Sequence, residues 1–196
     1  MAFINQEAKE IHCKVVYYGP SLSGKTTNIQ WVYQKTAPSD RSELMEFNTN
    51  PERTLFFDFL PMNVGQIRGL NTRFHLYTVP GQVVYDASRK LILKGLDGVI
   101  FVADSQLERM EENIEAMKNL EKNLEQQGYD IRQIPLVIQY NKRDLPNIAS
   151  VAELRAALNK YNAPDFEATA SIGRGVLESL RTVSKTIITT LKGGET

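Results

Sequence analysis

Three short, mostly apolar runs are spaced along the chain, at 13–18, 99–103 and 135–140. Each run is followed by turn residues and then by a segment in which apolar residues recur every three or four positions. Continuous apolar runs are typical of strands buried on both faces, and the recurring spacing is typical of helices. The pattern therefore predicts a strand-loop-helix order, as in a largely parallel sheet.

The same pattern predicts two helices that are apolar on one side only. One has Glu, Lys and Asn on its outer face and an apolar stripe at Leu107, Met110, Ile114, Met117, Leu120 and Leu124. The other runs from about Gly175 to the end of the chain, with a stripe at Val176, Leu180, Val183, Ile187 and Leu191. Because each helix has a single apolar stripe, both are expected to cover a face of the sheet.

Two further strand-like stretches, 54–60 and 72–79, precede the run at 99–103. Their connection, 63–71, contains two glycines, and such connections are typical of antiparallel hairpins. We therefore expect an α/β fold with a mixed, mostly parallel sheet of six strands and helices on both faces. The chain is expected to form a single domain over residues 1–196, since no linker, repeat or low-complexity segment interrupts the pattern.

The composition excludes some classes of function. The 23 Lys and Arg residues balance 23 Asp and Glu residues, so no net charge attracts nucleic acid or an anionic membrane. Cys13 is the only cysteine and cannot form an internal disulfide. No run approaches the ~20 apolar residues of a membrane span, and neither a prenylation nor a myristoylation signature is present. We expect a cytoplasmic protein with no nucleic-acid partner and no direct membrane anchor.

The segment from Gly19 to Thr26 matches the phosphate-loop pattern G-x-x-x-x-G-K-[ST]. It follows a predicted buried strand and precedes a helix around 29–33, where backbone N–H groups and a helix N-terminus can converge on phosphate. A glycine-rich turn with a surface lysine is disfavoured because strand, loop and helix occur in the required order. The nucleotide-binding residues predicted here are Gly19, Ser21, Leu22, Ser23, Gly24, Lys25, Thr26 and Thr27, with Lys25 on the outer phosphates and Thr26 on Mg²⁺.

A phosphate loop does not determine which base the nucleotide carries, but a second motif does. Asn141, Lys142 and Asp144 form N-K-x-D directly after the buried run at 135–140. The Asp144 carboxylate can accept from both the ring N–H and the amine of guanine, a donor pair that adenine lacks. A polar turn that closes a strand is the alternative, but the phosphate loop upstream favours base recognition. A weaker signal is the segment Thr169, Ala170 and Ser171, whose backbone can offer an N–H to the guanine oxygen.

In the order of these motifs the chain resembles the Ras-like small GTPases. The run at 51–60, together with Thr78-Val79-Pro80-Gly81-Gln82, is similar to the branch of that superfamily that acts in bacterial gliding motility. The resemblance covers essentially the whole chain. It implies a GTP/GDP switch with bound Mg²⁺ that controls the cell polarity and motility machinery. A dimeric roadblock-type activator, motility effectors and recruitment to the cell poles by partners are implied with it.

The resemblance also assigns roles that the residues alone do not establish. Thr54 would give a hydroxyl to Mg²⁺ together with Thr26, and Gly81 would donate its N–H to the γ-phosphate. Gln82 would orient the attacking water, and Arg53 would act as an arginine finger once a partner has remodelled the switch. From the residues alone, Arg53 is a surface arginine and Thr54 a residue that opens a strand.

Two positions depart from the pattern of small GTPases. Thr78 stands where an aspartate usually holds Mg²⁺ through water, so either the metal binds more weakly or another carboxylate such as Asp58 replaces it. Ser21 stands where glycine is usual in the phosphate loop, and its side chain is expected to slow hydrolysis. A guanine-nucleotide-binding scaffold with negligible turnover therefore stays open as an alternative. A small-molecule kinase is disfavoured by N-K-x-D and by the lack of an arginine-rich lid.

Replacing Asp144 by Asn should shift the base preference from guanine toward xanthine. The carboxylate accepts two donors of guanine, and hydrogen bonds to a charged group contribute about 1.5–3 kcal/mol each, so the preference should move by at least about tenfold. Competition of GDP and xanthosine diphosphate for a labelled nucleotide measures the change. An unchanged preference would count against this assignment.

Overall fold

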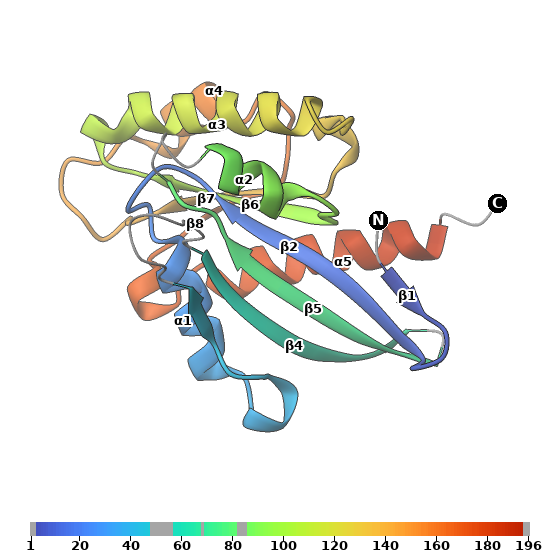
Figure 1. Ribbon diagram of the computed structural model, residues 1–196. Coiled ribbons are helices and arrows are strands. Elements are labelled where there is room, and N and C mark those ends of the chain that lie inside the picture. Colours follow the sequence, from blue (N-terminus) through green and yellow to red (C-terminus); the bar gives the residue numbers. More distant parts are fainter. Residues whose placement is uncertain (1–2, 48–56, 68, 82–85, 194–196) are drawn as a thin grey trace.

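The described parts of the chain, residues 3–47, 57–67, 69–81 and 86–193 of the computed structural model, are built around one twisted sheet (Figure 1). The strand order is β3-β4-β5-β2-β6-β7-β8, with β1 paired to β2. Neighbours from β5 to β8 along this order are parallel, whereas β4, β3 and β1 are each antiparallel to a neighbour. The strands are β1 (Phe3–Asn5), β2 (Glu10–Tyr18), β3 (Met45–Phe47), β4 (Phe57–Ile67), β5 (Leu70–Thr78), β6 (Gly98–Asp104), β7 (Leu136–Asn141) and β8 (Asp165–Glu167).

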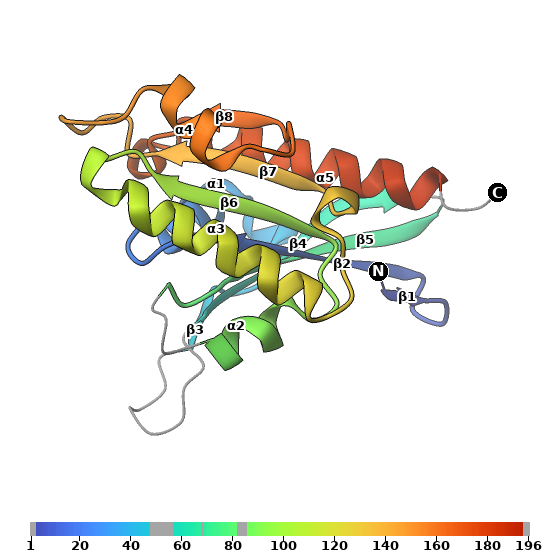
Figure 2. The same cartoon turned by 90° about the horizontal axis from the view of Figure 1, so that it is seen from above.

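Helices cover both faces of the sheet, as Figures 1 and 2 show. Apolar side chains of α1 and α5 pack on one face, and those of α2, α3 and α4 pack on the other. The helices are α1 (Lys25–Lys35), α2 (Asp86–Leu93), α3 (Met110–Glu125), α4 (Val151–Leu158) and α5 (Val176–Gly193). Short 3-10 segments are η1 (Pro38–Asp40), η3 (Leu107–Arg109), η4 (Ile131–Gln133) and η5 (Ala170–Ile172).

The predicted buried strands are confirmed because the central strands are covered on both sides. Every residue of β6 and of β7 is buried. Successive side chains of a strand point to opposite faces. Val99 and Phe101 accordingly join the core under α3, while Ile100 and Val102 join the core under α1 and α5.

The mixed, mostly parallel sheet is confirmed, and it contains two three-residue edge strands, β1 and β3, beyond the six expected. Three residues are too few for a period-two pattern to appear in a sequence. The predicted connection 63–71 is wrong, because β4 and β5 continue through most of it to Ile67 and from Leu70. This part of the β4–β5 pair has polar residues and an irregular register between Asn63 and Gln66, so its sequence does not show the alternation that predicts a strand.

The helix stripes are confirmed except at Leu107, which precedes α3 in η3 and is 55% exposed. Two helices were not predicted, α2 and α4. A start signal for α4 is present in the sequence, since Ser150 and Glu153 form a capping box. The Glu153 backbone N–H donates to Ser150 Oγ at 3.2 Å, and the Ser150 N–H donates to Glu153 Oε2 at 2.8 Å.

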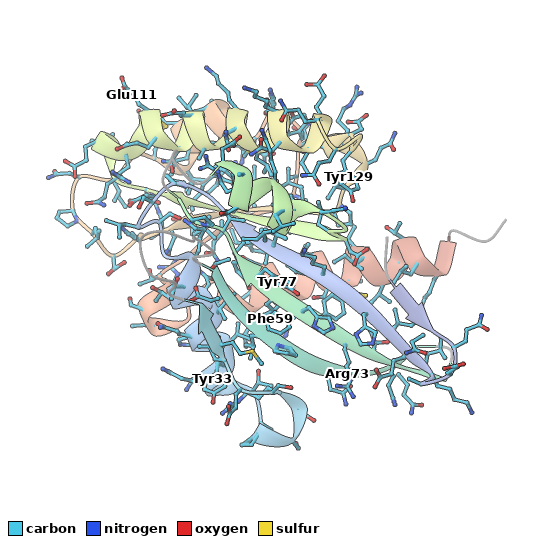
Figure 3. All side chains as sticks on the ribbon, in the orientation of Figure 1. Tyr33, Phe59, Arg73, Tyr77, Glu111 and Tyr129 are labelled. Atoms are coloured by element: carbon cyan, nitrogen blue, oxygen red, sulfur yellow. The ribbon has the colours of Figure 1, made fainter. Side chains whose placement is uncertain are left out.

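The β4–β5 ribbon carries aromatic side chains on the face that also bears α2 and α3. The rings of Phe59 and Tyr77 lie on neighbouring strands with centroids 4.7 Å apart (Figure 3). Both side chains are half-buried. Phe59 is therefore a surface residue of the ribbon, and the core face of the same strands is formed by residues such as Leu60 and Leu76.

Candidate nucleotide-binding site

The carboxyl ends of the parallel strands meet at one edge of the sheet, which is where ligands bind in open α/β folds. The phosphate loop follows β2 there, and the predicted base-reading segments follow β7 and β8. A cavity of about 370 Å³ opens between the loop and the end of β5. It is lined by Leu22, Gly24, Lys25, Thr26, Thr27, Asp58, Thr78, Val79, Pro80 and Gly81.

Both glycines of the phosphate loop are required by close contacts as well as by conformation. Gly19 has φ 143°, and a Cβ there would fall 2.2 Å from the Val102 carbonyl oxygen. Gly24 has φ 100°, and its Cβ would fall 2.2 Å from Asn141 Nδ2. Any larger residue would push the loop away from β6 or from the base-reading segment. The spacing of the two glycines in the sequence is thus explained by two different neighbours.

The middle of the loop holds three predicted residues in different surroundings. Leu22 has φ 61°, a conformation that costs a non-glycine residue about 1–2 kcal/mol, and its side chain is 81% exposed at the cavity. Ser23 is fully buried. The carbonyl oxygen of Ser21 accepts from Arg109 Nη2 at 2.8 Å, and Arg109 also pairs with Glu112 at 2.7 Å. Arg109, the last residue of η3, therefore holds the loop at Ser21.

The ammonium group of Lys25 is turned back onto the loop that carries it. Its Nζ donates to the carbonyl oxygens of Gly19 at 3.0 Å and Pro20 at 2.6 Å, and the residue is 7% exposed. The pKa of Lys25 is lowered from 10.5 to about 7, first by burial and then by the nearby cation of Arg89, while the Asp58 carboxylate acts in the opposite direction. Phosphate oxygens in this cavity would provide the anionic partner that the lysine has only in part.

Thr26, Asp58 and Thr78 meet at the other side of the cavity. Thr26 Oγ1 donates to Asp58 Oδ2 at 2.6 Å, and Thr78 Oγ1 donates to the same oxygen at 2.9 Å. The Asp58 backbone N–H in turn donates to Thr78 Oγ1 at 2.8 Å. Asp58 and Thr78 are both buried. A carboxylate from β4 therefore lies at the end of β5, beside the hydroxyl predicted to bind Mg²⁺.

Gly81 lies directly against the phosphate loop. A Cβ on Gly81 would fall 2.4 Å from Ser21 N and Cα, so the two backbones are in close contact. The other predicted switch residues, Arg53, Thr54 and Gln82, lie outside the described residues.

The Asn141 side chain connects the predicted base-reading segments to the phosphate loop. Its Nδ2 donates to the Ser23 carbonyl at 2.8 Å, and its Oδ1 accepts from the Ala170 backbone N–H at 2.9 Å. Ser171 is exposed beside Ala170, and Thr169 is buried. The three loops are thus brought together, although here the Ala170 N–H that was predicted to meet guanine donates to Asn141.

Asp144 and Lys142 stand at the open side of this arrangement. The Asp144 side chain is exposed and free to accept from a ligand in solvent. Lys142 has φ 65°, and its Nζ lies 2.6 Å from Oδ2 of Asp104, which is fully buried at the end of β6. This ion pair holds the lysine side chain against the end of β6.

Two residues that hold the site were not found from the sequence, Asp104 and Arg109. Asp104 ends a buried strand, and a carboxylate at the carboxyl end of a parallel strand was the available signal. Arg109 lies within a charged helix face, and such a residue has no sequence feature that separates it from its solvated neighbours.

Known proteins resemble this chain over most of its length. The profile of the ADP-ribosylation factor family matches residues 1–187. Mutual gliding-motility protein MglA of Myxococcus xanthus is 61% identical over 194 residues, which cover 99% of this chain and 100% of that protein. The human ADP-ribosylation factor-like proteins 4A and 4C are 30% and 29% identical, over 74% and 85% of this chain and 64% and 82% of their own.

The chain belongs to the ADP-ribosylation factor family. It is therefore a small GTPase of the Ras-like type, as the order of its motifs predicts. No helix among the described residues of this GTPase is long and apolar enough to cross a membrane.

Nucleotide binding by this GTPase should take up about one proton at pH 8.5. The pKa of Lys25 is lowered to about 7, so its amine is mostly neutral at that pH, and a phosphate anion favours the charged form. The phosphate groups of GDP, with their last pKa near ~6, are already ionised there. Calorimetry of GDP binding in buffers of different ionisation enthalpy gives the proton count, which should fall at lower pH.

The matched variant is Lys25→Arg, whose guanidinium stays protonated at every pH used. Its binding should proceed without proton uptake at pH 8.5. If the parent protein also takes up no proton at pH 8.5, Lys25 is already charged before the nucleotide binds and this interpretation is wrong.

Proposed function

We propose that this GTPase is a GTP/GDP switch that sets cell polarity for gliding motility, with residues 1–196 acting as one domain. The observation that carries the proposal is the hydrogen bonding of the Asn141 side chain. It connects the phosphate loop at Ser23 to the loop after β8 that contains Thr169, Ala170 and Ser171, here called the base loop. A nucleotide bound across these loops would contact both ends of a site that is already assembled. The role in motility is supported by the 61% identity to the gliding-motility protein MglA.

In the proposed site the nucleotide is contacted by three groups of residues. The phosphates lie on the loop residues Gly19, Ser21, Leu22, Ser23, Gly24, Lys25, Thr26 and Thr27. The guanine lies on Asn141, Lys142 and Asp144 and beside Thr169, Ala170 and Ser171. Each group of residues follows a different strand, β2, β7 or β8. The phosphates and the base are therefore contacted by separate segments of the chain, which the bound nucleotide spans.

Magnesium fits the oxygen-rich corner at Thr26. Mg²⁺ prefers oxygen ligands and usually binds through one or two carboxylates, water and substrate phosphates. The Thr26 hydroxyl and the Asp58 carboxylate, whose oxygens lie 2.6 Å apart, are oxygen ligands of this kind, and the Thr54 hydroxyl is proposed as a further one. When bound, the ion neutralises charge on the phosphates. Asp58 then fills the role that an aspartate at position 78 has in other small GTPases, and Thr78 orients Asp58.

Hydrolysis is proposed to depend on Lys25, Gly81, Gln82 and Arg53. Lys25 and the Gly81 N–H stabilise charge on the γ-phosphate, Gln82 orients the attacking water, and Arg53 enters the site with the help of an activator. The close contact of Gly81 with Ser21 supports slow intrinsic turnover, because the γ-phosphate must separate these two backbones. The same contact favours the second candidate, a scaffold that binds GTP with negligible hydrolysis.

The proposed partners follow from the resemblance to MglA. A roadblock-type dimer of the MglB kind would remodel the switch that contains Arg53, and motility and polarity effectors would bind the GTP form. The protein would act in the cytoplasm and be recruited to the cell poles by these partners.

Asp58→Asn should raise the Mg²⁺ concentration needed for GTP binding by at least about tenfold, because the neutral amide attracts the cation less. Titration of Mg²⁺ against a fluorescent GTP analogue measures the midpoint. Thr78→Val is the comparison variant, since it removes the hydrogen bond to Asp58 and keeps the carboxylate; it should move the midpoint less than Asp58→Asn does, because the negative charge remains. Equal midpoints for Asp58→Asn and the parent protein would exclude Asp58 from the metal site.

Single-turnover hydrolysis of GTP, alone and with a roadblock-type activator, tests the switch itself. Intrinsic rates of small GTPases are as low as about 10⁻⁴ s⁻¹, and a placed arginine finger adds about 10³–10⁵. We expect a slow rate alone, a large gain with the activator, and loss of that gain in Arg53→Ala. Ser21→Gly should hydrolyse faster than the parent protein. Negligible turnover under all conditions would favour the scaffold.

A further inference from the structure

A cluster of polar side chains is buried in the core beneath the nucleotide site. Asn28 of α1, Gln139 of β7 and Ser179 of α5 are each fully buried. Their neighbours on this face of the sheet are apolar, including Ile29, Val137 and Val176. Polar groups placed in such surroundings are costly unless every one of them is hydrogen-bonded.

The hydrogen bonds of this cluster are directional and reciprocal. Asn28 Nδ2 donates to Gln139 Oε1 at 2.9 Å, and Gln139 Nε2 donates to Asn28 Oδ1 at 3.0 Å. Turning either amide over would set donor against donor and acceptor against acceptor. Turning both together would restore the pair but would point the Asn28 oxygen at the Gly24 carbonyl, so the outer partners select one arrangement, which an apolar pair at the same place would not impose.

The remaining donors of the cluster reach the elements that carry the site. Asn28 Nδ2 also donates to the carbonyl oxygen of Gly24, in the phosphate loop, at 2.9 Å. Gln139 Nε2 also donates to Ser179 Oγ at 3.2 Å, and Ser179 Oγ donates to the Gly175 carbonyl at 2.7 Å. Gly175 directly precedes α5 and Ser179 lies in its first turn, and this helix follows the base loop at Ala170.

The position of Gln139 relative to Asn141 makes the cluster a second layer of the same connection. Residues two apart on a strand point to the same face, so both side chains point toward α1 and α5. Asn141 joins Ser23 to Ala170 at the end of β7. Gln139, two residues earlier in the strand, joins Asn28 of α1 to Ser179 of α5, and Asn28 lies four residues after Gly24.

We propose that the Asn28–Gln139 amide pair is a positioning device that sets the distance between the phosphate loop and the base-reading strand. GDP and GTP bind as two linked groups, phosphates on one loop and guanine on the other, and the gain from linkage requires that both sites be spaced to fit the ligand. The inference rests on the proposed nucleotide contacts of these loops. It assigns to Asn28 and Gln139 a role in affinity without contact with the ligand.

The experiment compares the whole ligand with its parts. Inhibition constants of GDP, inorganic pyrophosphate and guanosine are measured by displacement of a fluorescent GDP, together with the thermal unfolding midpoint. The variant Asn28→Leu/Gln139→Met replaces both amides by the apolar residues of nearest shape, so no buried donor is left alone. GDP affinity should fall at least tenfold, whereas pyrophosphate and guanosine, which each contact one loop, should change less than threefold.

A matched control removes a buried amide elsewhere. Asn159 closes α4 through bonds to Ala163 and is 8% exposed, far along the chain from the phosphate loop. Asn159→Leu should lower the unfolding midpoint and leave the ratio of GDP to fragment affinity unchanged. If it changes the ratio as much as the double variant does, the effect belongs to general stability and the proposal is wrong.

Should the apolar double variant not fold, the exchanged pair Asn28→Gln/Gln139→Asn keeps two facing amides. Each exchange alone should weaken GDP binding, and the pair together should recover most of the loss. Absence of recovery, or unchanged GDP affinity in the apolar double variant, overturns the positioning role. A parent protein that binds no GDP would refute the proposed function instead.

Discussion

The Asn141 carboxamide joins two loops of the site directly. It donates to Ser23 and accepts from Ala170, so the phosphate loop and the base loop are held at a fixed distance by the end of β7. Gly24 has no side chain because Asn141 Nδ2 occupies the space that a Cβ would need. Asn141 thus explains both the glycine at position 24 and the hydrogen bond of the Ala170 N–H. It lies 118 residues after Ser23 in the sequence.

Hydrogen bonds also fix the position of the Asp58 carboxylate at the end of β5. Thr78 cannot attract a cation, but its hydroxyl both donates to the Asp58 carboxylate and accepts from the Asp58 N–H. Because β4 is antiparallel to β5, Asp58 lies beside Thr78 with its side chain toward Thr26. The carboxylate of β4 therefore lies at the corner of the cavity formed by Thr26 and Thr78.

The sequence predicted the parts of this fold that repeat regularly. Buried runs gave β2, β6 and β7, and spaced stripes gave α3 and α5, because burial on a sheet imposes those periods. The phosphate loop and N-K-x-D were found because their chemistry needs particular residues at fixed spacing. Three-residue strands such as β3, and α2, carry no such signal. Asp104, Arg109 and Gln139 escaped because their partners come from distant segments and only the folded chain brings them together.

A buried polar cluster beneath a binding site has a cost that an apolar core would avoid, since each amide must lose water before it gains a partner. At most buried positions of the sheet apolar residues are enough to form the core. In β6, for example, every residue before Asp104 is apolar. Gln139 interrupts the otherwise apolar start of β7 at the level where α1 and α5 both approach the strand. A ligand that spans two loops needs their separation to be fixed, and directional hydrogen bonds fix a separation more sharply than dispersion contacts do.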